Sequence, residues 1–450
     1  MIPRKILLDL DKWAGTLPRK PLIIEGAFRT GKTFVAVKFA KKFQQLIHID
    51  LSEATWQKVF LKQEPTEEIL SVLFFLTGKS HSIKRTLIFL DEVRESPSAL
   101  RWMEEIHTRY PDLYLLAASS RHLSLPQPGI SGKPDSFTRL FLSPCSFSEF
   151  LEALGDRDLV ESYRGGPVPS EMREKLTNKF HLYSLIGGMP EIIHQYLQDR
   201  NFSGLKPIYE QIMEYHLEKI DLVSGSNKKR HLLRFTLQNA FPYAATRIKF
   251  RDFGNAPFQS REMGESFRQL EKLRLLKLVY PVTSTVFPMK TDASRSPRLQ
   301  MLDVGMVNYF SGIQKHLYHS DDLRTLFKGQ IARQVIGQEL AATDPFQERI
   351  NFWIRPKLQS TAEVDFVVPF HDQVIPVEIK QGETGRLRSL FQFMDESPHP
   401  FAMRLYAGPL SICQTQTIRK KKFFLMSLPY FLAGRIREHL EDFIKFVNAI

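Results

Sequence analysis

Residues 22–43 constrain the fold more than any other part of this 450-residue chain. They read as a short apolar strand, then Gly26-x-x-x-x-Gly31-Lys32-Thr33, then an amphipathic helix. Glycines let the backbone turn its N–H groups inward, and a helix N-terminus carries partial positive charge. The pattern therefore predicts a loop that binds phosphate, with an ordinary glycine turn as the alternative.

The side chains of this loop have separate expected roles. Lys32 would place a cation on the β- and γ-phosphates of a nucleotide and act in catalysis, and the Thr33 hydroxyl would ligate Mg²⁺. The residues predicted to bind the nucleotide are Gly26, Ala27, Phe28, Arg29, Thr30, Gly31, Lys32 and Thr33.

Two acids follow the apolar run at residues 85–90. Buried parallel strands read as continuous apolar runs, and ligands of such sheets bind at the strand C-termini. Asp91 is therefore predicted to hold Mg²⁺, and Glu92 to orient the water that attacks the γ-phosphate. The alternative is that the two acids only cap the next helix.

Strands alternate with helices through the first third of the chain. This alternation predicts a doubly wound parallel α/β core. The fourth strand ends on Ser119 and Ser120, either of which could contact the γ-phosphate or the attacking water; we assign the catalytic role to Ser119, and a turn cap is the alternative. The predicted strands are residues 22–25, 45–50, 85–93, 112–120 and 138–147.

Charge and composition limit the binding partners and the cellular compartment that we expect for this chain. Sixty-two Lys and Arg against 49 Asp and Glu give a net charge of +13, which favours nucleic acid, although basic proteins often carry charge diffusely. No apolar run is long enough to span a bilayer, and the acidic N-terminal segment is unlike a signal peptide. With two cysteines only, we expect a cytoplasmic protein without a membrane partner.

The middle of the chain reads as helical and then mixed. Residues 151–225 have helical periodicity with one break at residues 185–191. Residues 226–325 read as helix, helix and hairpin, the order of a winged helix that could contact DNA. In the helix at residues 266–276, three apolar side chains are predicted to face a core and three basic ones to face solvent. These are Phe267, Leu270 and Leu273, and Arg268, Lys272 and Arg274.

The last segment, residues 326–450, contains a second group of charged residues. Asp365 lies in one predicted strand, and Glu378 and Lys380 share a face of the next, because strand side chains repeat every second residue. Two carboxylates and a lysine suit a Mg²⁺-dependent phosphodiesterase. A salt-bridged exposed face is the alternative. Glu339 lies on the helix that precedes these strands.

These features together resemble a family of prokaryotic AAA+ ATPases, related to STAND and archaeal-type ATPases. Its members carry a C-terminal domain of unknown function built on a winged helix and a PD-(D/E)XK-nuclease-like core. The resemblance rests on the P-loop, the Asp91–Glu92 pair, Gly187-Gly-Met-Pro190 and Glu363-Val-Asp365. It also rests on residues 118–120, 144–151, 302–305 and 376–380.

The resemblance implies ATP and Mg²⁺ as ligands, with Pro190 near the adenine. It also implies the fold class and domain order: α/β, with an AAA+ P-loop core at residues 1–150 and a helical lid at 151–225. A winged helix would follow at residues 226–325 and a PD-(D/E)XK-like domain at 326–450.

Two positions depart from the family pattern. In nuclease-like relatives a glutamate lies six residues before the position of Glu339, and here that position is Arg333. The metal site would then be incomplete unless Glu339 substitutes. The family often has Gly-Arg ahead of the fifth strand, whereas Arg139 has no glycine before it.

Three functions follow as hypotheses. The first is an ATPase that couples Mg·ATP binding and hydrolysis to the C-terminal winged-helix and nuclease-like module, acting on or near DNA. The second is an ATP-gated, Mg²⁺-dependent DNA endonuclease that uses Asp365, Glu378 and Lys380, with Glu339 as a further ligand. The third is a non-enzymatic nucleotide switch or scaffold that binds a protein partner. A homo-oligomer is compatible with each.

Overall fold

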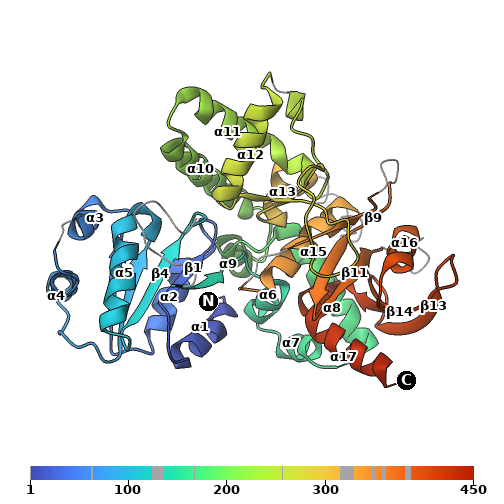
Figure 1. The fold of residues 1–450 in the computed structure, drawn as a ribbon, viewed down its shortest axis with the longest axis horizontal. Coiled ribbons are helices and arrows are strands. Elements are labelled where there is room, and N and C mark those ends of the chain that lie inside the picture. Colours follow the sequence, from blue (N-terminus) through green and yellow to red (C-terminus); the bar gives the residue numbers. More distant parts are fainter. Residues whose placement is uncertain are drawn as a thin grey trace.

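The computed structural model describes most of the chain. The described residues are 2–61, 64–123, 136–166, 168–255, 257–314, 329–346, 350–356, 361–380 and 387–449. Figure 1 shows the first unit at one side, a group of helices at the top, and a second sheet at the other side.

The first unit is a five-stranded parallel sheet in the order β2-β3-β4-β1-β5. This confirms the α/β fold class and the predicted P-loop core. The strands are β1 (Leu22–Glu25), β2 (Gln45–Asp50), β3 (Thr86–Asp91), β4 (Tyr114–Ser119) and β5 (Thr138–Phe141). The helices are α1 (Ile6–Gly15), α2 (Lys32–Ala40), α3 (Ala54–Leu61), α4 (Thr66–Leu76) and α5 (Pro97–Arg109), with the short η1 (Val93–Glu95).

Helices cover both faces of this sheet. One apolar cluster packs α3, α4 and α5 on one face, and a second packs α1 and α2 on the other. Alternate residues of β1 supply the two clusters: Ile23 belongs to the first, and Leu22 and Ile24 to the second. A strand that is buried on both faces explains why β1 reads as an uninterrupted apolar run.

The middle of the chain is mainly helical. Its helices are α6 (Phe147–Leu154), α7 (Arg157–Arg164), α8 (Ser170–Ile186), α9 (Pro190–Asp199), α10 (Leu205–Ser224), α11 (Asn227–Ala240), α12 (Ser260–Lys272) and α13 (Val304–Phe310). The short η2 (Phe241–Tyr243) and η3 (Phe253–Asn255) lie between α11 and α12. The antiparallel strands β6 (Leu276–Val279) and β7 (Arg298–Met301) follow α12. Helix, helix and two-stranded sheet match the predicted order, and the winged-helix assignment itself stays a prediction.

The last segment holds a second five-stranded sheet, in the order β10-β11-β12-β14-β13. Its strands are β10 (Phe366–Phe370), β11 (Gln373–Ile379), β12 (Phe401–Tyr406), β13 (Ser411–Gln416) and β14 (Lys422–Pro429). The central strands β11, β12 and β14 are parallel, and the edge strands β10 and β13 are antiparallel to their neighbours. Around it lie α15 (Gln330–Ala342), β8 (Trp353–Ile354), β9 (Glu363–Val364), α16 (Arg388–Glu396), η5 (Tyr430–Arg435) and α17 (Ile436–Asn448).

The middle and last segments share one hydrophobic core. A single cluster of buried residues runs from Cys145 to Phe443 and also includes Ile2. The predicted boundary at 225/226 therefore crosses a continuous core, and the boundary at 325/326 lies outside the described residues. The division into four domains stays a prediction. Among the described residues, none of the helices combines the length and the apolar character needed to cross a bilayer.

The predicted faces of α12 are correct except at one residue. Phe267, Leu270 and Leu273 are buried, and Arg268 and Lys272 are exposed, as the helical period requires. Arg274 was predicted to face solvent, and that prediction is wrong: its side chain is 11% exposed and pairs with Glu25. The helix ends at Lys272, so its period no longer sets the direction of Arg274.

The contact between α13 and α8 requires glycine at position 305. A Cβ at Gly305 would lie 2.0 Å from the carbonyl oxygen of Ile186. We expect Gly305→Ala to lower the stability of the shared core by about 1–3 kcal/mol, because backbone atoms must move to admit the methyl group. Thermal unfolding measures the shift. Gly15→Ala is the control, because no atom lies within 4 Å of its Cβ position; equal midpoints for both variants would contradict the prediction.

Candidate nucleotide site

The phosphate-binding loop follows β1 directly and depends on both of its glycines. A Cβ at Gly26 would lie 2.5 Å from the carbonyl oxygen of Leu142, so the loop tolerates no side chain there. Gly31 has φ 93° and caps α2, in the left-handed region that favours glycine. Arg29 also has positive φ, 67°. The amide of Gly26 donates to the Ser119 carbonyl, which ties the loop to β4.

Lys32 folds back onto its own loop. Its ammonium group donates to the carbonyl oxygens of Gly26 (3.1 Å) and Ala27 (2.9 Å), and the Thr30 hydroxyl also donates to Ala27. Burial lowers the pKa of Lys32 to about 8, although Glu92 and Asp91 act to raise it. The lysine is thus a buried cation whose partners are neutral carbonyls, and an anion would be a stronger partner.

The two acids after β3 lie beside the loop, as predicted. Thr33 donates from its hydroxyl to Asp91 at 2.6 Å, and His48 lies 3.8 Å from the same carboxylate. Burial alone would raise the pKa of Asp91, but bonds from His48, Thr33 and the Glu92 amide lower it overall. Asp91 is therefore a carboxylate held ionised, next to a hydroxyl that could share a cation with it.

Glu92 is held by a serine, although not by the predicted one. The hydroxyl and the amide of Ser120 both donate to its carboxylate. The Ser119 hydroxyl instead donates to the carbonyl of Arg121 at 2.8 Å. Burial raises the pKa of Glu92, with Lys32 and Ser120 acting to lower it. Ser120 is thus the hydroxyl that reaches the acid proposed to activate water.

Helices α9 and α10 lie against the loop. Arg29 donates to Glu191 at 2.8 Å and stacks over the ring of Tyr215, which meets Phe28 edge to face at 5.5 Å between centroids. Pro190 begins α9, and its Cγ lies 3.9 Å from the Cβ position of Gly31. The segment predicted as a lid therefore contacts the P-loop, with Pro190 beside its second glycine.

A buried carboxylate precedes the loop, and sequence reasoning did not identify it. Glu25 is fully buried and lies 2.5 Å from Arg274, 3.4 Å from Arg139 and 3.7 Å from His122. Burial alone would raise the pKa of Glu25, but these groups lower it overall. The sequence did contain a signal for this residue, namely an acid at the end of an apolar strand, because a buried charge at such a position requires partners.

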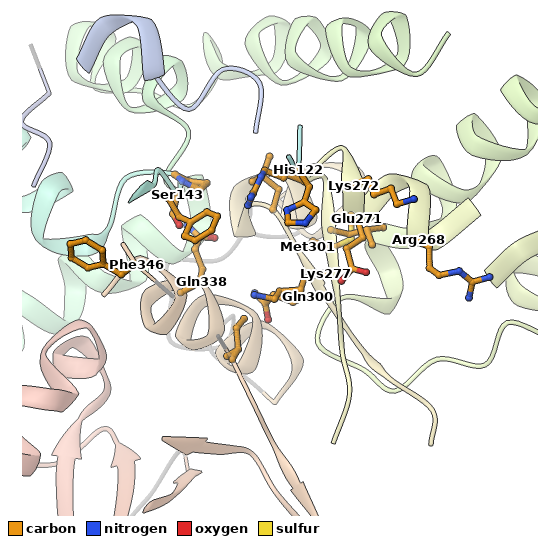
Figure 2. A pocket seen from close by; sticks show the side chains of 17 residues that line it. His122, Ser143, Arg268, Glu271, Lys272, Lys277, Gln300, Met301, Gln338 and Phe346 are labelled. Atoms are coloured by element: carbon orange, nitrogen blue, oxygen red, sulfur yellow. The ribbon is translucent and has the colours of Figure 1, made fainter. Parts of the chain in front are cut away.

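A cavity of about 710 Å³ opens between the first unit and the segment from α12 to β7. Figure 2 shows His122 beside Lys272 and Glu271 at one wall, and Gln300 and Gln338 on the other side. Polar and basic side chains line one part of this space, and apolar side chains, among them Phe141, Leu276 and Phe346, line the rest. Helix α15 also contributes to the lining, through Gln338.

The second group of charged residues converges at β10 and β11. Asp365 accepts from the amide of Ile379 at 2.9 Å, and Lys380 lies 2.9 Å from Glu378. Arg333 donates to Asp365 at 3.4 Å. Burial and the nearby Asp365 raise the pKa of Glu378 to about 7, although Lys380 acts to lower it.

Glu339 lies elsewhere. Its carboxylate accepts from the Phe147 amide at 2.9 Å and the Tyr183 hydroxyl at 2.8 Å, and burial raises its pKa to about 7. Arg333, not Glu339, is the α15 side chain that contacts Asp365. The structure therefore does not support Glu339 as a substitute metal ligand. Within the described ranges, no cluster of three or more His, Cys, Asp or Glu is arranged to hold a metal ion.

Three sequence families match parts of the chain. Residues 18–151 match an AAA domain, residues 177–317 a domain of unknown function (DUF8612), and residues 328–430 another domain of unknown function (DUF4143). The first unit, with its P-loop, paired acids and parallel sheet, is thus an AAA-type ATPase core. No curated protein matches the chain.

Several solved structures are similar at low identity. A Walker-type ATPase of Pyrococcus abyssi is 12% identical, with a TM-score of 0.43 over 69% of this chain and 96% of that one. The Orc1 protein of Aeropyrum pernix, solved with DNA, is 12% identical, with a TM-score of 0.32 over 70% and 95%. RuvB of Thermotoga maritima is 12% identical, with a TM-score of 0.30 over 62% and 90%. Since every score is below 0.5, the domain match and the loop geometry carry the assignment.

The Glu378 carboxyl predicts a pH-dependent stability. Its folded pKa, about 7, lies above the usual value, so its stabilising contribution is complete below about pH 4 and lost as pH rises through 7. We expect the free energy of unfolding of Glu378→Gln, taken relative to that of wild type, to rise by on the order of 2 kcal/mol from pH 5 to pH 8. Denaturant unfolding across this range measures it, with the exposed Asp372→Asn as control. A parallel pH dependence in wild type and Glu378→Gln would contradict the prediction.

Proposed function

We propose that this protein is an ATP-binding AAA+ ATPase of the cytoplasm. It would couple Mg·ATP binding and hydrolysis to its C-terminal module, acting on or near DNA. The observation that carries the proposal is the meeting of Lys32, Thr33, Asp91 and Glu92 at one edge of a parallel sheet. The AAA domain match over residues 18–151 supports the same conclusion.

Lys32 would act first on the nucleotide. Its ammonium group would exchange the carbonyls of Gly26 and Ala27 for β- and γ-phosphate oxygens, because charge-assisted hydrogen bonds are stronger than those to neutral carbonyls. The loop amides and the N-terminus of α2 would hold the remaining phosphate charge. The adenine would lie towards Pro190, which is next to Gly31.

Thr33 and Asp91 fit a magnesium ion. The hydroxyl and carboxylate oxygens lie 2.6 Å apart, and oxygen ligands are those that Mg²⁺ prefers. Bound there, the ion would neutralise charge on the β- and γ-phosphates. Asp91 is suited to this role because its own contacts keep it ionised.

Glu92 would orient the attacking water and accept its proton. Its carboxylate is fixed by two donors from Ser120, so little reorientation is needed when the water arrives. Burial raises the pKa of Glu92, which makes the carboxylate a stronger base. Ser119 contacts the P-loop through its carbonyl oxygen, which accepts from the Gly26 amide, and not through its hydroxyl.

The partner of the C-terminal module would be DNA. The net charge of +13 and the exposed Arg268 and Lys272 on α12 favour a polyanion. A homo-oligomer or a protein partner remains compatible with this arrangement. If nucleotide binds and no turnover is measurable, the protein is a nucleotide-dependent switch instead.

We expect Lys32→Ala to abolish measurable ATP turnover and to weaken ATP binding, because the main cation for the β- and γ-phosphates is lost. Glu92→Gln should retain binding and lose turnover, because it keeps the shape of the side chain and removes the base. Phosphate release and titration with a fluorescent ATP analogue measure the two quantities.

Lys38→Ala is the matched control, because Lys38 lies on the same helix α2, outside the loop. It should keep wild-type turnover. If Lys32→Ala and wild type hydrolyse ATP equally, the catalytic assignment fails.

Mg²⁺-dependent DNA cleavage is a second candidate function. The convergence of Asp365, Glu378 and Lys380 favours it, whereas the Arg333 cation next to Asp365 opposes metal binding. A nuclease would nick plasmid DNA in Mg²⁺, and Asp365→Ala would abolish that nicking, while the exposed Asp372→Asn would retain it. Nicking that persists in Asp365→Ala would exclude this site.

A further inference from the structure

Arg274 occupies a backbone position that disfavours its residue type. It lies in the turn between α12 and β6 with φ 59°, the left-handed region in which glycine or asparagine is usual. The Leu275 amide donates to the Leu270 carbonyl at 3.1 Å and closes this turn. Other non-glycine residues of the described chain share this region, Arg200 at the end of α9 among them, so the contacts of the Arg274 side chain are what point to a role.

The side chain of Arg274 reaches into the AAA domain. Its Nη2 lies 2.5 Å from Oε2 of Glu25, and its guanidinium stacks 4.8 Å from the ring centre of Phe141. Next to it, the His122 amide donates to the Lys272 carbonyl at 2.9 Å. The C-terminal end of α12 is thus attached to the AAA domain by a buried ion pair and a backbone hydrogen bond.

Glu25 connects this attachment to the nucleotide site. It is the residue before Gly26, whose carbonyl holds the Lys32 ammonium group. When the Lys32 ammonium group leaves the Gly26 carbonyl for a phosphate, that carbonyl loses its hydrogen-bond donor one residue away from Glu25. A triphosphate in the loop would also bring several negative charges to the residues that follow Glu25, and these charges would act on the Glu25–Arg274 ion pair.

We propose that Arg274 is a positioning residue that couples nucleotide occupancy of the P-loop to the position of the segment from α12 to β7, through its ion pair with Glu25. The proposal rests on the proposed ATP binding. A contact that differs between the two nucleotide states links the two regions reciprocally: the nucleotide moves the segment, and the segment changes the affinity for nucleotide.

The cavity in Figure 2 is the space that such a movement would change. Its walls come from the AAA domain, through His122 and Ser143, from the segment from α12 to β7, through Glu271, Lys277 and Gln300, and from α15, through Gln338. A shift of the segment would therefore alter the width of the cavity with the nucleotide state.

The test combines nucleotide titration with hydrogen exchange on the full-length chain. We expect Arg274→Met to weaken ATP binding about 5-fold or more, and Arg274→Lys to recover most of this loss. In wild type, ATP should change amide exchange across residues 260–279 as well as in the P-loop. In Arg274→Met, ATP should still protect the P-loop but leave residues 260–279 unchanged.

Arg261→Met is the matched control, since Arg261 is exposed on the same helix α12 and does not line the cavity. It should bind ATP as wild type does. If exchange in residues 260–279 of wild type does not respond while ATP binds and Lys32→Ala abolishes turnover, only the coupling is overturned. This readout needs no variant to fold. If wild type binds no nucleotide, the proposed function fails and the coupling fails with it.

Discussion

Parallel pairing of β1, β3 and β4 is the constraint on which the candidate site depends. The pairing sets Glu25 opposite Ser119, and it sets β3 beside β4 with all carboxyl ends at one edge of the sheet. Three chain segments that are separate in sequence therefore meet there: the P-loop, the Asp91–Glu92 pair and Ser120. The P-loop contributes backbone amides and the Lys32 cation. The Asp91–Glu92 pair contributes carboxylates, and Ser120 contributes a hydroxyl donor.

The sequence was sufficient to predict this edge and its main residues, because the physical causes are local. Buried parallel strands must be apolar throughout, so their ends are visible where charged or small polar residues begin. The loop glycines are required by backbone conformation and close approach, which the motif records directly. The choice between Ser119 and Ser120 was not local. Ser119 is the last residue of β4 and Ser120 follows it, and the position of Glu92 decides which of the two hydroxyls can reach it.

Long-range partners explain the remaining differences. Arg274 follows the helical period only up to the end of α12, and its partner Glu25 is 249 positions away. Glu339 and Arg333 lie on one helix, yet the first contacts Tyr183 and the second contacts Asp365. A single sequence shows the spacing of such residues but not the elements packed against each face. The contacts that join the AAA domain to the rest of the chain were therefore beyond sequence reasoning.

The continuous core from Cys145 to Phe443 has a consequence for how the chain can be divided. A cut at residue 225 would separate α6–α10 from the strands and helices that cover them and would expose apolar surface on both fragments. The AAA domain has its own apolar clusters, so the natural cut lies just before Cys145. Even there the N-terminal segment crosses the border, because Ile2 packs into the larger core and Arg4 donates to Glu149 at 3.3 Å. The first residues thus tie together two bodies that would otherwise fold around separate interiors.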